Sequence, residues 1–216
     1  MVLKLYFLSA SPPARAVLLT CRNLKLDVEL ITIDLFKSEH YKPDFLKLNP
    51  AHQIPVLVDN DFVLSESRAI MGYLVNKYQP DSSLYPTDVY KRALIDQRLY
   101  FDAQVFERNA AAIRPAFREP PEKPTNEAKY FITDYMEILD KILSDSVWFA
   151  GNSITIADYT ILVNISQIKA CGFDISKYTN LVRWFEKCKS IEGFDENNEA
   201  ALKLGELFKS RVGNVF

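Results

Sequence analysis

Hydrophobic residues near the start of the chain recur with two different periods. Short apolar or alternating runs rich in β-branched side chains predict strands, and these runs are residues 3–8, 28–35, 54–59 and 62–65. Apolar residues three and four positions apart predict helices, and these stretches are the one that follows Ser11, residues 45–49 and residues 66–78. The order β-α-β-α-β-β-α predicts one small mixed sheet with helices packed against it.

The pattern changes after residue 78. Residues 79–88, QPDSSLYPTD, are rich in Pro, Ser and Asp and predict a linker. From Val89 onward there is no convincing strand pattern, and long helical patterns continue toward the C-terminus. We therefore expect an α/β domain in residues 1–80 and an all-α domain in residues 88–216.

Composition and charge narrow the function classes. The chain has 216 residues, 48% of them hydrophobic and 25% charged, which is typical of a soluble globular protein. A net charge of −2 argues against a nucleic-acid binder, which usually carries a basic excess. No run approaches the roughly 18 apolar residues that span a membrane, and the first residues, MVLKLYFLSA, read as a strand and not as a signal peptide.

Cysteine and histidine are too sparse for a metal site. The three cysteines are far apart in sequence and form no C-x-x-C pair, which suits a reducing cytosol and predicts neither a disulfide framework nor a zinc site. The only histidines are His40 and His52, too few for a histidine-based cluster. We expect no bound metal.

A serine and two prolines precede the first predicted helix, in the stretch LSASPPARAVLLT at residues 8–20. Proline is favoured at the first position of a helix, so the Ser11 hydroxyl should lie at the helix N-terminus. Two interpretations remain open. The hydroxyl can cap the helix, which stabilises it by about 1 kcal/mol, or it can donate a hydrogen bond to a bound thiolate, which the helix dipole also favours.

Two further loops shift the balance toward a binding site. Ile54-Pro55 opens a strand, and a cis bond there would turn the Ile54 backbone outward toward an extended ligand, whereas the alternative is an ordinary trans proline. Glu66 and Ser67 fall in the first turn of a predicted helix, where they either complement the helix dipole or hold a carboxylate. The three loops would then converge on one edge of the sheet.

Four stretches in order make the chain resemble the cytosolic glutathione transferases, and most of all the insect delta and epsilon classes. They are LYFLSASPPARAV, KSEHYKPDFLKLNPAHQIPVLVD, LSESRAIMGYLVNKY followed by SLYP, and FAGNSITIADY. The resemblance implies a thioredoxin-like N-terminal domain, a helical C-terminal domain and a cytoplasmic homodimer. It implies an enzyme of detoxification that conjugates glutathione, its co-substrate, to small hydrophobic electrophiles and needs no other cofactor.

The same resemblance implies roles for individual residues. Ser11 would activate the glutathione thiol, Ile54 would bond its cysteinyl backbone, and Glu66 and Ser67 would hold its γ-glutamyl group. The other residues implied to bind glutathione are His40 and His52 near the glycyl carboxylate, Gln53 and Pro55 beside Ile54, and the ion-pair network of Arg68 and Asp102. Glutathione carries two carboxylates, an ammonium and a thiol, which fits helix N-termini, Glu66 and a hydroxyl donor. Because Ser-Pro-Pro-Ala at residues 11–14 replaces a C-x-x-C motif, disulfide exchange is not expected.

The expected electrophile pocket departs from the family pattern. Relatives usually present aromatic residues from the helix that we expect over 89–115, whereas Glu107, Ala111 and Arg114 occupy the matching face here. The remaining expected wall residues are Leu35, Phe117, Leu204 and Phe208. We expect a polar pocket in which Arg114 favours flat electrophiles with a nitro or carboxylate group. The alternative is that Glu107 and Arg114 pair with each other or with solvent on the helix surface.

The segment FAGNSITIADYTIL, residues 149–162, predicts a structural motif. Thr155 and Asp158 are spaced as a capping box at a helix start, with Asp in place of the usual Glu. We expect Asp158 to be a folding determinant and not a catalyst. Two alternatives to an enzyme remain: a non-catalytic carrier of hydrophobic ligands, and a structural module on the same fold.

Overall fold

The computed structural model describes residues 3–216, and its first part is built on one four-stranded sheet. The elements of this part are β1 (Leu3–Phe7), α1 (Pro12–Asn23), β2 (Glu29–Thr32), the 3₁₀ turn η1 (Glu39–Tyr41), α2 (Pro43–Leu48), β3 (Val56–Asp59), β4 (Phe62–Ser65) and α3 (Ser67–Tyr78). The strand order is β2-β1-β3-β4. β1 and β2 are parallel, and β3 is antiparallel to both β1 and β4. The predicted thioredoxin-like order of elements is confirmed.

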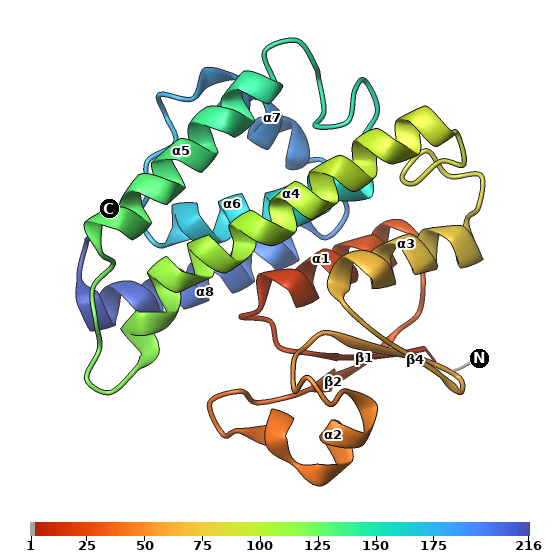
Figure 1. Cartoon of the computed structure of the whole chain (residues 1–216), viewed down its shortest axis with the longest axis horizontal. Coiled ribbons are helices and arrows are strands. Elements are labelled where there is room, and N and C mark those ends of the chain that lie inside the picture. Colours follow the sequence, from red (N-terminus) through yellow and green to blue (C-terminus); the bar gives the residue numbers. More distant parts are fainter. Residues whose placement is uncertain (1–2) are drawn as a thin grey trace.

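Helices cover both faces of this sheet. Figure 1 shows α1 and α3 between the sheet and the second part of the chain, and α2 on the opposite face. Leu5 of β1 pairs with Leu57 of β3, and both are fully buried. β2 is shorter than the predicted strand 28–35, because the Asp34 side chain accepts hydrogen bonds from the backbone N–H groups of Phe36 (2.9 Å) and Lys37 (3.2 Å) and turns the chain.

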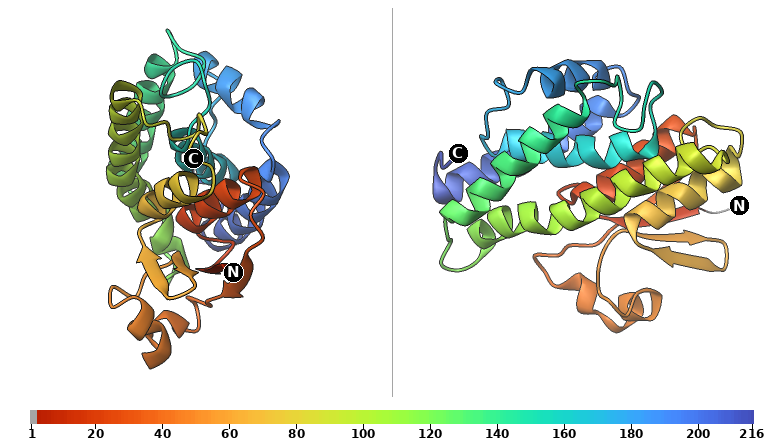
Figure 2. Two further views of the ribbon diagram at one scale, coloured as in Figure 1. Left: turned by 90° about the vertical axis from the view of Figure 1, so that its right-hand side faces the viewer. Right: turned by 45° about the horizontal axis from the view of Figure 1, so that its top comes forward.

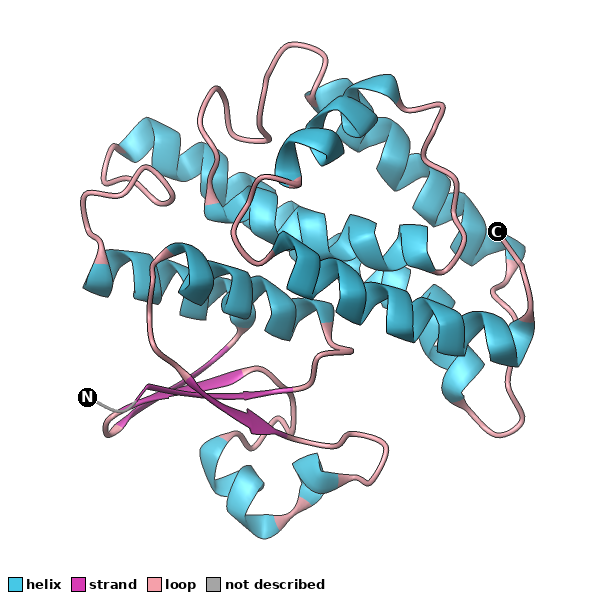
Figure 3. Ribbon diagram, turned by 180° about the vertical axis from the view of Figure 1, so that it is seen from behind, coloured by secondary structure: helices cyan, strands magenta, loops and turns pink. Residues whose placement is uncertain are grey.

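The second part is helical, as Figure 3 shows by its colours. Its elements are α4 (Val89–Ile113), the 3₁₀ turn η2 (Arg114–Phe117), α5 (Asn126–Ile142), α6 (Ile156–Ala170), α7 (Thr179–Cys188) and α8 (Phe194–Val212). The α-helix 89–113 is shorter than the expected 89–115, because Pro115 has no N–H to donate to the Ala111 carbonyl, and the chain continues as the 3₁₀ turn η2. The division of the domains at residues 80 and 88 stays a prediction.

The centre of the helical part is α6, nearly all of whose residues are buried. The two views of Figure 2 show the other helices around it, with α1 alongside. Gly205 of α8 backs against the last turn of α6, where a Cβ atom would stand only 2.4 Å from the carbonyl oxygen of Ala170. The absence of a side chain at this position therefore lets the two helices approach closely. No helix within residues 3–216 has the length and apolar character needed to cross a bilayer.

A buried arginine joins the two parts. Arg15 of α1 is 2% exposed and donates hydrogen bonds to Asn197 Oδ1 (2.8 Å), Gln167 Oε1 (3.1 Å) and the Ser9 carbonyl (2.8 Å). Burial lowers the pKa of Arg15 to about 9, which still leaves it charged at neutral pH. It thus ties the loop before α1 to α6 and α8.

Candidate active site

Two pockets of different chemistry meet where α1 begins. One has a volume of about 790 Å³ and lies against the loop from Asn49 to Pro55 and the start of α3. The other, of about 410 Å³, lies among mostly apolar side chains of α4, η2, α6 and α8. The residues that line both are Ser11, Leu35, Phe106 and Arg114. A ligand with a polar body in the first pocket could therefore present one end to an apolar molecule in the second.

Ser11 lies at this junction with its hydroxyl free to contact a ligand. Its carbonyl accepts the first helical bond from Arg15 N at 3.0 Å, but within the described residues its side chain does not cap the helix. Pro12 and Pro13 fill the first two helical positions and have no N–H to offer, and the hydroxyl does not bond to the N–H of Ala14 at the third position either. The capping interpretation of Ser11 is therefore wrong, and the hydroxyl is available for a bound group.

Backbone geometry shapes the walls of the larger pocket. The Ile54-Pro55 bond is cis, and both residues line this pocket. Glu66 stands just before α3 with a φ of 68°, so it precedes the first turn in which the sequence predicted it. Ser67, 4% exposed, is the first residue of that helix, and both residues line the pocket. A positive φ in a residue other than glycine is uncommon.

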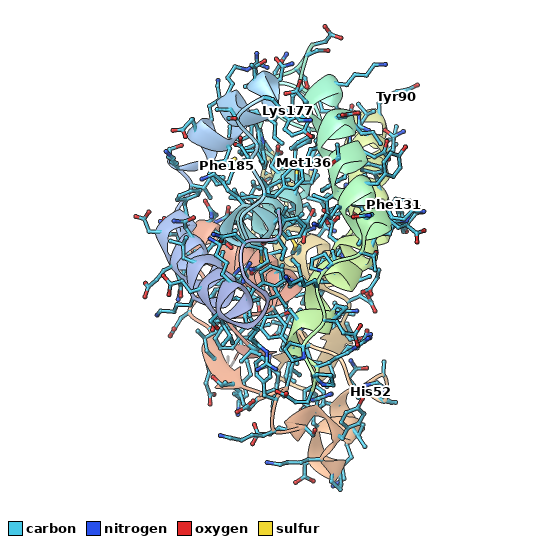
Figure 4. The ribbon with its side chains drawn as sticks, turned by 90° about the vertical axis from the view of Figure 1, so that its left-hand side faces the viewer. His52, Tyr90, Phe131, Met136, Lys177 and Phe185 are labelled. Atoms are coloured by element: carbon cyan, nitrogen blue, oxygen red, sulfur yellow. The ribbon has the colours of Figure 1, made fainter. Side chains whose placement is uncertain are left out.

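A cluster of three rings closes the far end of the larger pocket. The His40 ring centroid lies 4.1 Å from that of Tyr41, and the Tyr41 centroid lies 4.7 Å from that of His52. Burial, and secondarily the charge of His52, lower the pKa of His40. Figure 4 shows His52 at the end of the molecule that carries α2, away from the helical part. Two imidazoles at one end of a pocket suit the binding of an anionic group.

An ion pair between α3 and α4 supports the opposite end. Arg68 donates to Asp102, whose carboxylate is fully buried. Asp102 also accepts hydrogen bonds from Tyr135 Oη at 3.2 Å and from Asn164 Nδ2 at 2.6 Å. Burial and the nearby Asp102 raise the pKa of Tyr135 well above its ordinary value, so this hydroxyl keeps its proton. Asp102 thus reaches the pocket only through Arg68.

Comparisons with known proteins agree with this arrangement. Residues 1–76 match the family model described as Glutathione S-transferase, N-terminal domain, and residues 100–192 match Glutathione S-transferase, C-terminal domain. The chain belongs to the glutathione S-transferase family. Among solved structures, it is 37% identical to unclassified glutathione S-transferase 2 from Bombyx mori, with a TM-score of 0.92 over 98% of this chain and 99% of that one.

Two further structures connect this transferase with the insect classes. A delta-class glutathione transferase from Nilaparvata lugens is 39% identical, with a TM-score of 0.92 over 97% of this chain and 100% of that one. An epsilon-class enzyme from the housefly, Musca domestica, is 36% identical, with a TM-score of 0.92 over 97% and 98%. The predicted family, fold and glutathione-conjugating activity are confirmed, and a purely non-catalytic role is not favoured.

The predicted glutathione-binding residues of this transferase come together in space. All but Asp102 line the larger pocket, and they are His40, His52, Gln53, Ile54, Pro55, Glu66, Ser67 and Arg68. Asp102 lies behind Arg68, as described above. The structure brings these residues together, and their individual roles toward glutathione stay predictions.

The predicted electrophile-binding residues of the transferase need correction. Leu35, Arg114, Phe117 and Leu204 do line the smaller pocket, but Ala111 and Phe208 do not. Ala111 is exposed because α4 packs with the neighbouring face toward α6. Phe208 is fully buried and stacks on Phe216 with ring centroids 5.9 Å apart, so it belongs to the core.

Glu107 departs from its predicted place in a different way. It lines the larger pocket and forms an exposed ion pair with Arg114 at 2.9 Å, which is the alternative considered above. Phe106 takes the position on the pocket wall that we assigned to Glu107, because it lies in both pockets. The side of the pocket formed by α4 is therefore more apolar than predicted.

Other residues at the site were missed in the sequence. Asn49, 5% exposed, shapes the loop of the larger pocket, because its amide donates to the Gln53 carbonyl at 2.8 Å and its side-chain oxygen accepts from Ala51 N at 3.1 Å. The smaller pocket adds Phe36, whose ring contacts that of Phe117 edge to face at 6.1 Å. The Asn-Pro pair in the sequence signals a turn at Asn49, whereas nothing in the pattern marks Phe36.

Proposed function

We propose that this glutathione transferase is a cytosolic detoxifying enzyme in which Ser11 stabilises the glutathione thiolate while small hydrophobic electrophiles bind in the smaller pocket. The observation that carries the proposal is the position of Ser11, which lines both pockets and has a hydroxyl that does not cap its own helix. A hydroxyl donor at a helix N-terminus favours the thiolate over the thiol, because hydrogen bonding and the helix dipole both stabilise the charged form. No base beside Ser11 is needed, since the nucleophile is the sulfur of the substrate.

The larger pocket matches the remaining groups of glutathione. Ser67 at the start of α3 offers a hydroxyl and the helix N-terminus to the γ-glutamyl carboxylate, and Glu66 offers a carboxylate to the ammonium. His40 and His52 at the far end suit the glycyl carboxylate. The backbone of Ile54, which lines the same pocket, suits the backbone of the cysteinyl residue. The sulfur would then lie at Ser11, where the two pockets meet.

Replacement of Ser11 by alanine tests the proposal. One donor to a stabilised anion is worth about 10²-fold in rate, so we expect kcat/KM for 1-chloro-2,4-dinitrobenzene to fall by about that factor. The apparent pKa of enzyme-bound glutathione, taken from the pH profile, should rise toward that of the free thiol.

Ser9→Ala is the matched control, because Ser9 lies on the same loop and lines neither of the two pockets. It should retain the rate of the unmodified enzyme. An alanine variant at position 11 with an unchanged rate and thiol pKa would exclude Ser11 as the stabilising donor. Glutathione binding without turnover of any electrophile would instead favour a carrier function.

We also propose that two copies of the chain associate through the outer face of α4 and strand β4. Large apolar side chains are exposed there, namely Tyr90 (81%), Val89 (72%), Leu94 (48%), Phe62 (47%) and Val63 (39%). Figure 4 shows Tyr90 at the outer edge of the helical part. Exposed apolar patches of this kind mark interaction surfaces. Light scattering should give twice the mass of 24.8 kDa, and Tyr90→Glu together with Leu94→Glu should give the monomer.

A further inference from the structure

A buried asparagine lines the smaller pocket without a hydrogen-bond partner. Asn109 of α4 is 3% exposed, and among the residues that the structure describes neither Nδ2 nor Oδ1 has a partner. It shares a helix face with Phe106 and Ile113, three positions before it and four after it, and all three line the pocket. A buried amide of this kind is costly unless some other group bonds to it.

The other amides of this pocket are already engaged. Asn164 donates to Asp102 at 2.6 Å. The Gln167 carbonyl oxygen accepts from Arg15 at 3.1 Å, and its nitrogen contacts Cys171 Sγ at 3.7 Å. The guanidinium of Arg114 pairs with Glu107 and is largely exposed, so water screens it. Asn109 is thus the amide of this pocket, within residues 3–216, in which neither polar side-chain atom is engaged.

We propose that Asn109 is the specificity-determining residue of the smaller pocket: its amide, buried in this structure, turns into the pocket and donates a hydrogen bond to a nitro or carbonyl oxygen of the electrophile. This inference rests on the proposed function, in which electrophiles occupy this pocket. The substituents that make a carbon reactive toward a thiolate withdraw electrons, and nitro and carbonyl groups do so while offering only acceptor oxygens. The Nδ2 group, with two N–H donors, matches them.

The location of Asn109 separates recognition from reaction. Ser11, where the sulfur would lie, stands at the junction of the pockets, whereas Asn109 contributes to the smaller pocket alone. An electrophile would therefore present its reactive carbon to the junction and its acceptor oxygen to α4. In these surroundings, mostly apolar, a hydrogen bond loses little to competing water.

Asn109→Leu is the test, because leucine has the same branched arrangement of side-chain heavy atoms and cannot form hydrogen bonds. The two electrophiles are 4-nitrobenzyl chloride and 4-isopropylbenzyl chloride, whose branched para groups have similar shapes while only the nitro group accepts hydrogen bonds. We expect kcat/KM for the nitro compound to fall by about 3- to 10-fold, the range of one net hydrogen bond. The value for the isopropyl compound should stay the same or rise. Gln104→Leu, which removes an exposed amide from the same helix outside both pockets, should leave the ratio of the two rates unchanged.

Binding of the two S-benzylglutathione products, measured by calorimetry, gives a readout that needs no turnover. Asn109→Leu should weaken the nitrobenzyl conjugate by the same 3- to 10-fold and leave the isopropylbenzyl conjugate unaffected. Asn109→Ala should do the same, and it serves if the leucine variant does not fold. Equal effects on both conjugates, or none, would overturn the inference about Asn109. If the unmodified enzyme conjugates neither electrophile, the proposed function is refuted. The ratio of the two product affinities would still decide the role of Asn109.

Discussion

Replacement of Asp158 by alanine should reveal how firmly α6 is anchored. The fully buried carboxylate accepts four hydrogen bonds at the start of this helix. The donors are Phe149 N (3.0 Å), Trp184 Nε1 (3.1 Å), Thr155 N (2.9 Å) and Thr155 Oγ1 (3.1 Å). The predicted bond from Thr155 N to Asp158 is present, and Asp158 also connects α6 to α7 through Trp184.

The size of the effect follows from two opposing contributions. Alanine would leave three N–H donors without an acceptor, in residues no more than 4% exposed, and each costs about 1–3 kcal/mol. Against this, burial raises the pKa of Asp158 from 3.8 to about 6, which at about 1.4 kcal/mol per pKa unit disfavours the charged native state by roughly 3 kcal/mol at pH 7. We therefore expect Asp158→Ala to lower the free energy of unfolding by about 2–3 kcal/mol at pH 7.

The cost of this substitution should depend on pH. Between pH 3.8 and about 6 the native protein binds more protons at Asp158 than the unfolded chain does. The stabilisation from this group is therefore complete below pH 3.8 and decreases as the pH rises through about 6. The loss caused by Asp158→Ala should be about 1 kcal/mol larger at pH 5 than at pH 7.

Urea unfolding at pH 5 and pH 7, followed by the fluorescence of buried Trp184 at equal protein concentrations, measures both effects. Asp88→Ala is the control, because Asp88 caps α4 in an exposed position with one hydrogen bond from Lys91 N at 2.9 Å. It should cost about 1 kcal/mol or less and show no such pH dependence. The folded fraction of Asp158→Ala should keep its specific activity. If Asp158→Ala costs no more than Asp88→Ala, or costs the same at both pH values, the reasoning is refuted.

Three further outcomes are expected. Ser67→Ala and Glu66→Ala should weaken glutathione binding, measured by calorimetry, more than they change KM for the electrophile; affinities within twofold of the unmodified enzyme would exclude their roles. Arg114→Ala should alter the rates with 1-chloro-2,4-dinitrobenzene and cumene hydroperoxide by similar small factors, because its ion pair with Glu107 is exposed; selective loss of the first rate would restore Arg114 as a selectivity element. S-methylglutathione should bind more tightly at pH 6 than at pH 8. Burial lowers the pKa of His40 in the free protein, whereas a bound carboxylate favours the protonated form, so binding takes up a proton that is more available at pH 6. Equal affinities would argue against His40 as an anion ligand.

The sequence was most informative where local chemistry determines the structure. Two prolines after Ser11 constrain the backbone through covalent geometry, and the structure has a helix start there. The Ile54-Pro55 pair left both isomers open in the sequence, and the bond is cis in the structure. The spacing of Thr155 and Asp158 predicted a contact that lies within one helical turn. Such signals depend on neighbours in sequence, so they can be interpreted without knowing the rest of the fold.

Sequence reasoning was weakest on the faces of α4 and α8. Helical periodicity tells which residues share a face, but only tertiary packing tells which face meets the pocket, so Ala111 and Phe208 were assigned wrongly and Phe106 was missed. Asn109 was missed for a related reason, because an asparagine in a long helix looks like a solvent-facing residue until its burial is known.

The close contact at Gly205 makes two neighbouring positions of α8 differ in the substitutions that they can accept. Leu204 lines the pocket, so its replacement can reshape the cavity while α8 stays in place. Any side chain at position 205 would collide with the Ala170 carbonyl and push α8 away from α6, the helix that supplies Asn164 to the network behind Arg68. Changes in substrate preference should therefore proceed through position 204, while glycine is retained beside it.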